Sequence, residues 1–327
     1  MKNPAFAEFL CQIRENGSDM GGMKLKTGVA ALAVSMLLFT ADAGAAVSHQ
    51  VTGPEAKASR GFWTAARVAA ALKRDPDSAL NAASSPDRHP VATHHRPVTV
   101  YRPEVGKILA WDRNIGEFSC SGSIIDTRSL RLVLTAGHCV YADGVWARRH
   151  IFIPNFKNGR RPFGAYRVKA TWVSNAWFNN SFGTRGMNFD IGLLVTRKRW
   201  NGSRIGENVG AIPIQTFPRR YGVTDIYGYP GGAMRTRVMR TCRSHTKADW
   251  YGGRFFYGPT GLLARCNMAA GSSGGPWVSR YKAEGGGTIG VVDGLTSTGF
   301  SQGGRSYLTS PYFGRILVRL IKATEGR

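Results

Sequence analysis

The chain has 327 residues, a formal net charge of +24 and 41 glycines. This length allows one large or two medium domains, and clusters of β-branched and aromatic residues between glycine-rich turns favour many short strands over a helical bundle. No internal repeat, heptad run, metal-ligand spacing or glycine-lysine phosphate loop stands out, which argues against repeat proteins, coiled coils and P-loop nucleotide-binding proteins.

The positive charge is carried mostly by arginines that are scattered along the chain. Short basic runs recur at Arg148-Arg149, Arg160-Arg161, Arg197-Lys198-Arg199 and Arg219-Arg220. Such scatter is more typical of a solvated basic surface than of a face that reads nucleic acid, so no specific nucleic-acid partner is expected. Weak, salt-sensitive attraction to polyanions or to an anionic cell surface is expected from the net charge.

The first predicted element is an export signal. Met23-Lys24-Leu25-Lys26 supplies a positive start, residues 29–39 are apolar, and residues 41–45 form a small-residue cleavage region. The apolar stretch is short for a membrane span. We therefore expect a signal peptide at 23–45 after an N-terminal extension at 1–22, secretion to the periplasm or the medium, and no transmembrane anchor in the mature form. A buried helix is the alternative.

The next region has two compositions. Residues 55–80 are rich in alanine and have helical character, whereas residues 81–97 are rich in proline, serine and histidine, as linkers are. We interpret residues 46–97 as a pro-segment and linker ahead of the mature protein. The processing site is not located by the sequence.

The cysteines agree with export. Of the five, Cys11 precedes the signal, which leaves an even set of four: Cys120, Cys139, Cys242 and Cys266. Four cysteines allow three pairings, and the sequence alone does not choose between them. We expect Cys120–Cys139 and Cys242–Cys266, each of which closes a modest loop. A zinc site is the alternative, but no C-x-x-C spacing supports it, and no metal is expected.

His138 is the candidate general base. It follows a strand-like run at 130–135 through a short Ala-Gly turn, and the neighbouring Cys139 would fix it to the scaffold. The other histidines after residue 98 are His150 and His245, which stand in arginine-rich polar surroundings and are expected in exposed loops. A structural histidine is the alternative reading of His138 taken alone.

Asp190 is the candidate partner of that histidine. It opens the apolar run 191–195, and a carboxylate at the edge of a buried strand is costly unless it is paired. Such a carboxylate can orient an imidazole and stabilise the imidazolium that forms. Asp293, which also lies in a strand-like run, is the one rival.

Ser273 is the candidate nucleophile, in the segment Gly271-Ser272-Ser273-Gly274-Gly275-Pro276. Glycines give the backbone unusual freedom and allow close approach, so that the N–H groups of Gly271 and Ser273 can converge as an oxyanion hole requires. A free hydroxyl is a weak nucleophile and needs a base such as histidine. An ordinary Gly-Ser turn is the alternative for this segment alone.

A helix is expected at the C-terminus. Pro311 is a suitable first residue, and apolar residues then recur at the spacing of a core-docking helical face: Phe313, Ile316, Leu317, Leu320 and Ile321.

Three of these segments together resemble the signatures of the trypsin/chymotrypsin-like serine peptidases. They are Thr135-Ala136-Gly137-His138-Cys139, Asp190-Ile191-Gly192-Leu193-Leu194 and the segment 271–276, in the family's order of His, Asp and Ser. A fourth segment, Cys120-Ser121-Gly122-Ser123-Ile124-Ile125, is similar to the strand whose cysteine usually bonds the one after the histidine. The resemblance spans 98–327. The α/β-hydrolases order their triad Ser, Asp, His, and no histidine follows Ser273, so that fold is excluded.

The resemblance implies an all-β fold of two packed six-stranded antiparallel β-barrels, at 98–210 and 211–327, with a C-terminal helix in the second part. It also implies a secreted serine endopeptidase that works through an acyl-enzyme. Ser273 would attack the peptide carbonyl, His138 would accept its proton, and Gly271 and Ser273 would hold the oxyanion. Proteins or peptides are the implied partners, no cofactor is needed, and we expect a monomer.

Two departures from the trypsin pattern bear on activation and specificity. The residue before the nucleophile is Ser272 and not the aspartate of trypsin-like zymogens, so the chain is closest in character to bacterial V8-like and glutamyl endopeptidases. Asn267 or Met268 is expected at the base of the substrate pocket and Asp293 on its wall, where contact with a basic side chain and a buried structural role remain alternatives. The wall strand lacks the histidine that glutamyl endopeptidases use.

The competing interpretation is a catalytically silent scaffold of the same fold that binds polyanions through its basic surface. The presence of all three triad residues argues against it.

Overall fold

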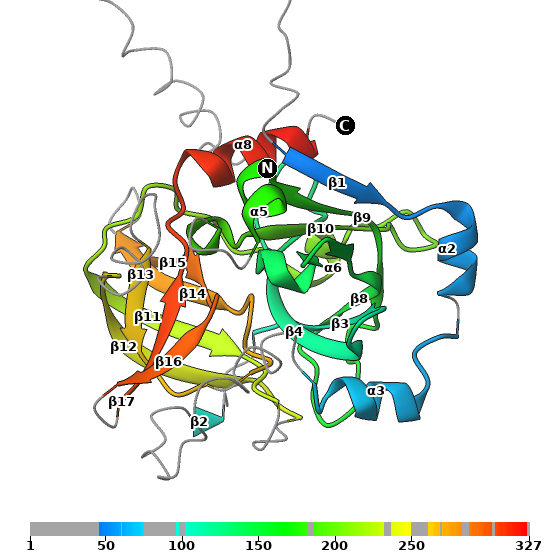
Figure 1. The fold of residues 1–327 in the computed structure, drawn as a ribbon, viewed down its shortest axis with the longest axis horizontal. Coiled ribbons are helices and arrows are strands. Elements are labelled where there is room, and N and C mark those ends of the chain that lie inside the picture. Colours follow the sequence, from blue (N-terminus) through cyan, green and yellow to red (C-terminus); the bar gives the residue numbers. More distant parts are fainter. Residues whose placement is uncertain are drawn as a thin grey trace, which may run out of the picture. The chain divides into compact units, whose positions relative to one another are not determined.

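A computed structural model describes residues 46–59, 61–74, 96–97, 102–181, 186–231, 237–249, 261–268, 270–282, 288–302 and 305–325. These residues all belong to one compact unit, Asp42–Arg327. The predicted extension at 1–22 and signal peptide at 23–45 lie outside the described residues. Figure 1 shows two curled sheets that lie side by side, with helix α8 (Arg315–Glu325) above them.

The first sheet closes into a barrel. Its order is β1-β9-β10-β5-β4-β3-β8. A further pairing of β9 with β8 closes a ring of six strands: β3, β4, β5, β8, β9 and β10. Neighbouring strands of this sheet pair antiparallel within the described residues, and β1 lies outside the ring. The strands are β1 (Ala46–Gln50), β3 (Val105–Asp112), β4 (Gly116–Ile124), β5 (Leu132–Thr135), β8 (Arg148–Pro154), β9 (Tyr166–Ser174) and β10 (Gly192–Thr196).

The second sheet is curled, with the order β15-β14-β11-β12-β13-β17-β16, and the short strand β2 pairs with β12 beside this path. Its strands are β2 (Arg96–Pro97), β11 (Gly222–Gly228), β12 (Arg240–Ala248), β13 (Leu262–Arg265), β14 (Pro276–Lys282), β15 (Thr288–Leu295), β16 (Gly299–Gln302) and β17 (Arg305–Ser310). The all-β fold of two trypsin-like barrels with a C-terminal helix is therefore confirmed, the second one appearing as a curled sheet in the part of the chain that is described.

The remaining elements are short. They are α2 (Gly53–Ala58), α3 (Ala65–Ala71), α5 (Asn175–Asn180), α6 (Ile205–Val209), the 3₁₀ turns η1 (Gly137–Cys139) and η2 (Met187–Phe189), and the hairpin of β6 (Tyr141–Ala142) with β7 (Val145–Trp146). None of the helices within the described residues combines the length and apolar character that crossing a membrane would need.

Strand β9 illustrates how the sequence specifies burial. Its first half alternates, with Tyr166 and Val168 buried and Arg167 and Lys169 exposed, as expected for a strand with one solvent face. Its second half is buried throughout; β1 pairs with this half, and α5 and α8 also contact β9. The alternation therefore reports the local surroundings of each half of the strand.

The described residues form two buried apolar clusters. The larger one occupies the first barrel and continues to side chains of the second sheet and of α8. The smaller one lies within the second sheet around Trp277 and the disulfide Cys242–Cys266. Between the sheets the chain makes one parallel bridge from Ile212 to Ile125 and another from Ile214 to Val292. The predicted boundary between 210 and 211 remains a prediction.

Several local expectations were wrong. Helix α8 begins at Arg315 and not at Pro311. The carbonyl of Phe313 accepts a 2.7 Å hydrogen bond from Phe217 N–H, and Gly314 N–H closes a tight turn on Tyr312 O at 2.8 Å. His150 is buried on β8, and His245 is exposed but on β12, so neither stands in a loop. The helical region expected at 55–80 is two short helices, and residues 75–80 lie outside the described part.

Candidate active site

Strand pairing places His138 beside Asp190. Strands β5 and β10 pair with Gly192 opposite Thr135, and His138 follows Thr135 by three residues while Asp190 precedes Gly192 by two. The backbone N–H of His138 donates to Asp190 Oδ1 at 2.8 Å, and its Nδ1–H donates to Oδ2 at 2.8 Å. Both side chains are fully buried.

This contact fixes the tautomer of the imidazole. A carboxylate only accepts hydrogen bonds, so the proton of the neutral ring lies on Nδ1 and the lone pair lies on Nε2. Gly137 permits the close approach, because a methyl group there would lie 3.0 Å from Asp190 Oδ1 and 2.9 Å from Trp177 Nε1. A histidine held in this way is suited to accept a proton at Nε2.

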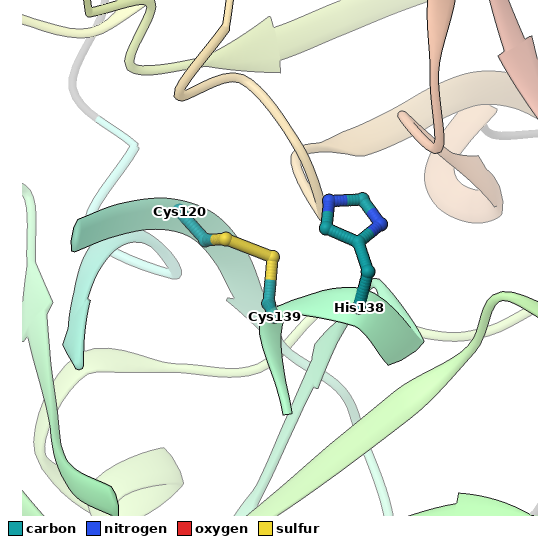
Figure 2. A group of neighbouring side chains, drawn as sticks. All are labelled: Cys120, His138 and Cys139. Atoms are coloured by element: carbon teal, nitrogen blue, oxygen red, sulfur yellow. A yellow bond between two sulfur atoms is a disulfide. The ribbon is translucent and has the colours of Figure 1, made fainter. Parts of the chain in front are cut away.

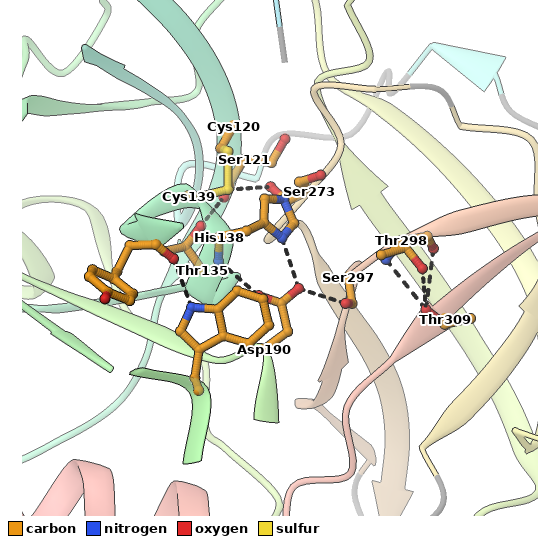
Figure 3. Close-up of polar contacts among 12 residues, drawn as sticks. Cys120, Ser121, Thr135, His138, Cys139, Asp190, Ser273, Ser297, Thr298 and Thr309 are labelled. Carbon is orange, nitrogen blue, oxygen red and sulfur yellow. Dashed lines mark hydrogen bonds and ion pairs between the residues drawn. A yellow bond between two sulfur atoms is a disulfide. The ribbon is translucent and has the colours of Figure 1, made fainter. Parts of the chain in front are cut away.

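Ser297 is a further partner of the carboxylate that the sequence analysis missed. Its hydroxyl donates to Asp190 Oδ2 at 2.6 Å from just beyond β15, in the second sheet (Figure 3). It lies 107 positions from Asp190 along the chain, and no local pattern marks it. The buried charge of Asp190 is thus compensated by two side chains and one backbone donor.

Ser273 lies across the imidazole from Asp190 in Figure 3, where its carbonyl oxygen is 3.9 Å from Cys139 Sγ. Its segment is held by Ser121 of β4. The N–H of Ser121 donates to Ser273 O and its hydroxyl donates to Gly271 O, both at 2.8 Å. The first sheet therefore fixes the segment that carries the candidate nucleophile.

Every polar atom of Ser121 is hydrogen-bonded, and its N–H and hydroxyl make the contacts between the two halves of the molecule. Its hydroxyl oxygen also accepts the N–H of Tyr229 at 2.9 Å, and its carbonyl accepts the hydroxyl of Thr135 at 2.9 Å. Lys107, fully buried, donates from Nζ to the carbonyl of Tyr229 at 3.2 Å. The sequence analysis quoted Ser121 only as part of a motif, and its role depends on the second sheet.

Glycines shape the nucleophile segment as the sequence predicts. Gly271 has φ +94° and Gly274 has φ +78°, in the left-handed region. A methyl group on Gly271 would lie 2.8 Å from both Gly231 N and Tyr229 O, and one on Gly274 would overlap the hydroxyl of Thr135. A larger residue at Gly274 would push this segment away from the first barrel, and one at Gly271 would collide with the backbone of Tyr229 and Gly231.

Two disulfides fix the surroundings. Cys120 is bonded to Cys139, with a Cα–Cα distance of 6.3 Å, and Cys242 to Cys266, with a distance of 6.2 Å. Figure 2 shows the first disulfide next to His138. Among the described residues, Cys120, His138 and Cys139 are the group whose atom types could hold a metal ion, but the disulfide leaves no thiolate to bind one.

His150 is buried and contacts the backbone of Cys139, the residue that follows His138. Its Nε2–H donates to the carbonyl of Cys139 at 3.0 Å. The pKa of His150 is lowered to about 4, chiefly by burial; the hydrogen bond to Cys139 O raises it in part, and the charges of His49 and Glu55 lower and raise it respectively. The imidazole is therefore neutral at neutral pH.

The residues predicted to bind substrate lie in different settings. Met268 belongs to the apolar cluster of the second sheet, and its Sδ would be 3.5 Å from a methyl group on Gly228. Asn267 is half-buried beside it. Asp293 is buried, accepts a hydrogen bond from Tyr281 at 3.3 Å, and has its pKa raised to about 6 by burial, against hydrogen bonds from Ser279 and Tyr281.

The fold and this site define a peptidase of the two-barrel class. The family model described as Trypsin matches residues 105–310, so the chain belongs to the trypsin family. No curated protein matches it.

Solved structures agree with this assignment. The protease Anisep from Arthrobacter nicotinovorans is 25% identical with a TM-score of 0.61, and the match covers 71% of this chain and all of that one. The thermostable serine protease AL20 from an extremophilic microorganism is 27% identical with a TM-score of 0.59, over 69% of this chain and 98% of that one. These proteases support a peptidase activity for the chain.

Proposed function

We propose that the chain is a secreted serine endopeptidase whose catalytic triad is His138, Asp190 and Ser273. The observation that carries the proposal is the double contact of Asp190 with the backbone and the ring of His138, at 2.8 Å each, in a fully buried setting. It leaves the lone pair of the imidazole on Nε2, the atom that must accept a proton from serine.

In this mechanism Ser273 Oγ attacks the carbonyl carbon of the peptide while its proton moves to His138 Nε2. The tetrahedral intermediate then collapses, the C–N bond breaks, and His138 returns the proton to the leaving amine. Water repeats the sequence on the acyl-enzyme and frees the carboxylate product. Asp190 stays ionised and stabilises the imidazolium that forms in both steps.

The backbone N–H groups of Gly271 and Ser273 are proposed to hold the oxyanion. The carbonyls of both residues are engaged by Ser121, and the positive φ of Gly271 sets the course of the backbone. Donors that are fixed before substrate binds stabilise a developing oxyanion without reorganisation.

We infer the substrate preference from the residues predicted to line the pocket. Neither Asn267 nor Met268 offers the negative charge with which trypsin-like enzymes select arginine and lysine, and Ser272 offers none to a new N-terminus. We therefore place the enzyme closest in character to bacterial V8-like peptidases, acting as a monomer on protein or peptide substrates. Asp293 is proposed to face the same pocket.

Export is proposed to remove the signal peptide at 23–45 and to deliver the enzyme outside the cytoplasm, where its disulfides are stable. We further propose that the two barrels divide at residues 98–210 and 211–327.

A catalytically silent scaffold that binds polyanions is the second candidate, which the net charge of +24 favours. It is the weaker one, because the family assignment and the protease neighbours point to turnover.

A fluorophosphonate probe tests the proposal directly, since it reacts covalently with activated serines. The processed wild-type protein should take one label, which peptide mapping places on Ser273, and Ser273→Ala should take none. Ser272→Ala is the matched control for this neighbouring serine and should still be labelled. A folded wild-type protein that takes no label would contradict the proposal and favour the silent scaffold.

A further inference from the structure

The segment Ala46–Arg74, which precedes the trypsin-family match, is built into the first barrel. Strand β1 pairs with β9 from Ala46 opposite Ser174 to Gln50 opposite Ala170, and Val51 N–H continues the pairing to Lys169 O at 2.9 Å. On this edge β8 pairs only with Tyr166 and Arg167 of β9. Strand β1 thus fills a strand edge that the barrel would otherwise leave open.

Helix α3 contributes to the same core. Val68 and Ala71 belong to the main apolar cluster of the first barrel, and Ala71 is fully buried. Trp63 Nε1–H donates to Arg149 O at 2.8 Å, and the carbonyl of Arg74 accepts Ser119 N–H of β4 at 3.1 Å. Removing the segment would therefore expose apolar core as well as backbone.

The start of the segment supports the side of the site that carries His138. His49 contacts Glu55 at 3.0 Å and stacks on Trp146, whose ring packs on Tyr141, two residues beyond Cys139. His49 and Glu55 also interact electrostatically with His150, which holds the carbonyl of Cys139. Strand β1 and helix α2 therefore pack behind the loop of the catalytic histidine.

The end of the segment supports the side that carries Ser273. A methyl group on Gly231 would lie 3.0 Å from the carbonyl oxygen of Leu72, so the end of α3 packs directly on this glycine. Gly231 N–H donates to Ala270 O, and a methyl group on Gly271 would lie 2.8 Å from Gly231 N. The segment therefore contacts the supports of both halves of the site.

We propose that the surface formed by β9, Arg149, Ser119 and Gly231 permanently holds the chain's own segment Ala46–Arg74, so that this segment remains in the active enzyme after any cleavage. The proposal differs from the interpretation of 46–97 as a pro-segment and linker ahead of the mature protein, because it keeps residues 46–74 in that protein. No cysteine lies between Cys11 and Cys120, so after a cut the segment would be held by non-covalent contacts alone: strand pairing, hydrogen bonds and apolar packing. Its effect on activity rests on the proposed function.

The composition of the active protein tests the retention. The exported full chain is labelled with the fluorophosphonate probe and its mass is measured under native and then denaturing conditions. We expect the labelled native species to contain residues 46–74, joined to the catalytic chain or released as a companion peptide on denaturation. A labelled species that begins after residue 74 and has no companion peptide would overturn the proposal. If no label is taken, the proposed function fails, and the native mass still decides the retention.

A matched pair of variants in α3 of the full chain tests whether the segment supports the site. Ala71→Asp places a charge at a buried position, whereas Ala69→Asp places it at an exposed position of the same helix. We expect Ala71→Asp to slow the labelling of Ser273 at least ten-fold and Ala69→Asp to label at the wild-type rate. Equal rates for the two variants would overturn the supporting role.

A milder variant covers the case in which Ala71→Asp does not fold. Trp63→Phe keeps an aromatic ring but removes the hydrogen bond to Arg149 O. After cleavage in the linker, its companion peptide should dissociate at a lower denaturant concentration than the wild-type peptide does. Unchanged dissociation of the peptide would count against retention through these contacts.

Discussion

At the scale of single residues, the site depends on side chains that connect the two sheets. Ser121 is fully buried and joins β4 to Gly271, Ser273 and Tyr229 through its backbone and hydroxyl. Ser297 makes the corresponding connection from the second sheet to Asp190. Two serines outside the proposed triad therefore support the positions of Ser273 and of Asp190, the partner of His138.

Replacing Ser121 tests this positioning role. Ser121→Ala removes the donor to Gly271 O and leaves the buried N–H of Tyr229 without its acceptor, a cost of about 1–3 kcal/mol. We expect kcat for a small ester to fall about ten-fold, which corresponds to about 1.4 kcal/mol, while KM changes little.

The same strand provides the control for Ser121. Ser123 is also fully buried, but its hydroxyl has no hydrogen-bond partner among the described residues. Ser123→Ala should therefore keep the wild-type kcat. An equal loss of kcat in the two variants would show that any change in β4 lowers the activity. The contacts of Ser121 would then have no specific role in positioning the site.

His150 gives the fold a dependence on pH. Its pKa is about 4 in the folded protein and about 6.5 in the unfolded chain. As the pH falls, the unfolded chain takes up a proton on His150 before the folded protein does. The free energy of unfolding therefore decreases between pH 6.5 and pH 4, by about 3 kcal/mol at most. His49 and Glu55 face His150 from β1 and α2, and their charges act on the pKa of His150 in opposite directions.

Urea unfolding at pH 7.5 and pH 4.5 measures the contribution of His150 to the free energy of unfolding. His150→Gln retains an N–H donor for Cys139 O but does not titrate. The wild type should lose about 2–3 kcal/mol more stability than the variant between the two pH values. An identical loss in both proteins would assign the pH dependence to other groups.

At the scale of elements, helix α8 connects the end of the chain to the first barrel. It packs on β9, as Figure 1 shows, with Leu317 and Leu320 fully buried. The carboxylate of Glu325 accepts the N–H of Ser129 at 2.9 Å and its hydroxyl at 2.5 Å. Helix α8, at the C-terminal end of the chain, thus stabilises the first barrel.

Truncating the helix core tests this connection. Leu320→Ala should destabilise the protein by about 2–5 kcal/mol, because it removes a fully buried side chain and leaves a cavity. Lys322→Ala, at an exposed position two residues along, should change stability by no more than about 0.5 kcal/mol. Thermal unfolding followed by tryptophan fluorescence measures both, and a small effect of Leu320→Ala would mean that α8 is not needed by the barrel.

At the scale of the whole molecule, the net charge of +24 comes from separated basic runs. We expect retention on a sulfated column that weakens steadily with salt. Arg160 and Arg161 are exposed, and replacing both with glutamine should shift elution only slightly and leave labelling of Ser273 unchanged. Complete loss of retention in this variant would reveal a localised polyanion site and strengthen the second candidate function.

The sequence by itself determined the features that depend on neighbours along the chain. The glycines around Ser273, the cysteine after His138 and the apolar run after Asp190 each restrict the local backbone or its burial, so the family and the fold class could be predicted from them. The alternation in the first half of β9 is a feature of the same kind.

Only the tertiary structure decided the features that depend on which strands meet. Ser297 reaches Asp190 across 107 positions and Ser121 reaches Gly271 across 150, because antiparallel pairing and the packing of two sheets bring distant residues together. The same pairing buries His150, which stands in a polar sequence, and adds β1 to β9. Local sequence constrains each backbone segment, whereas register and sheet packing select its partners.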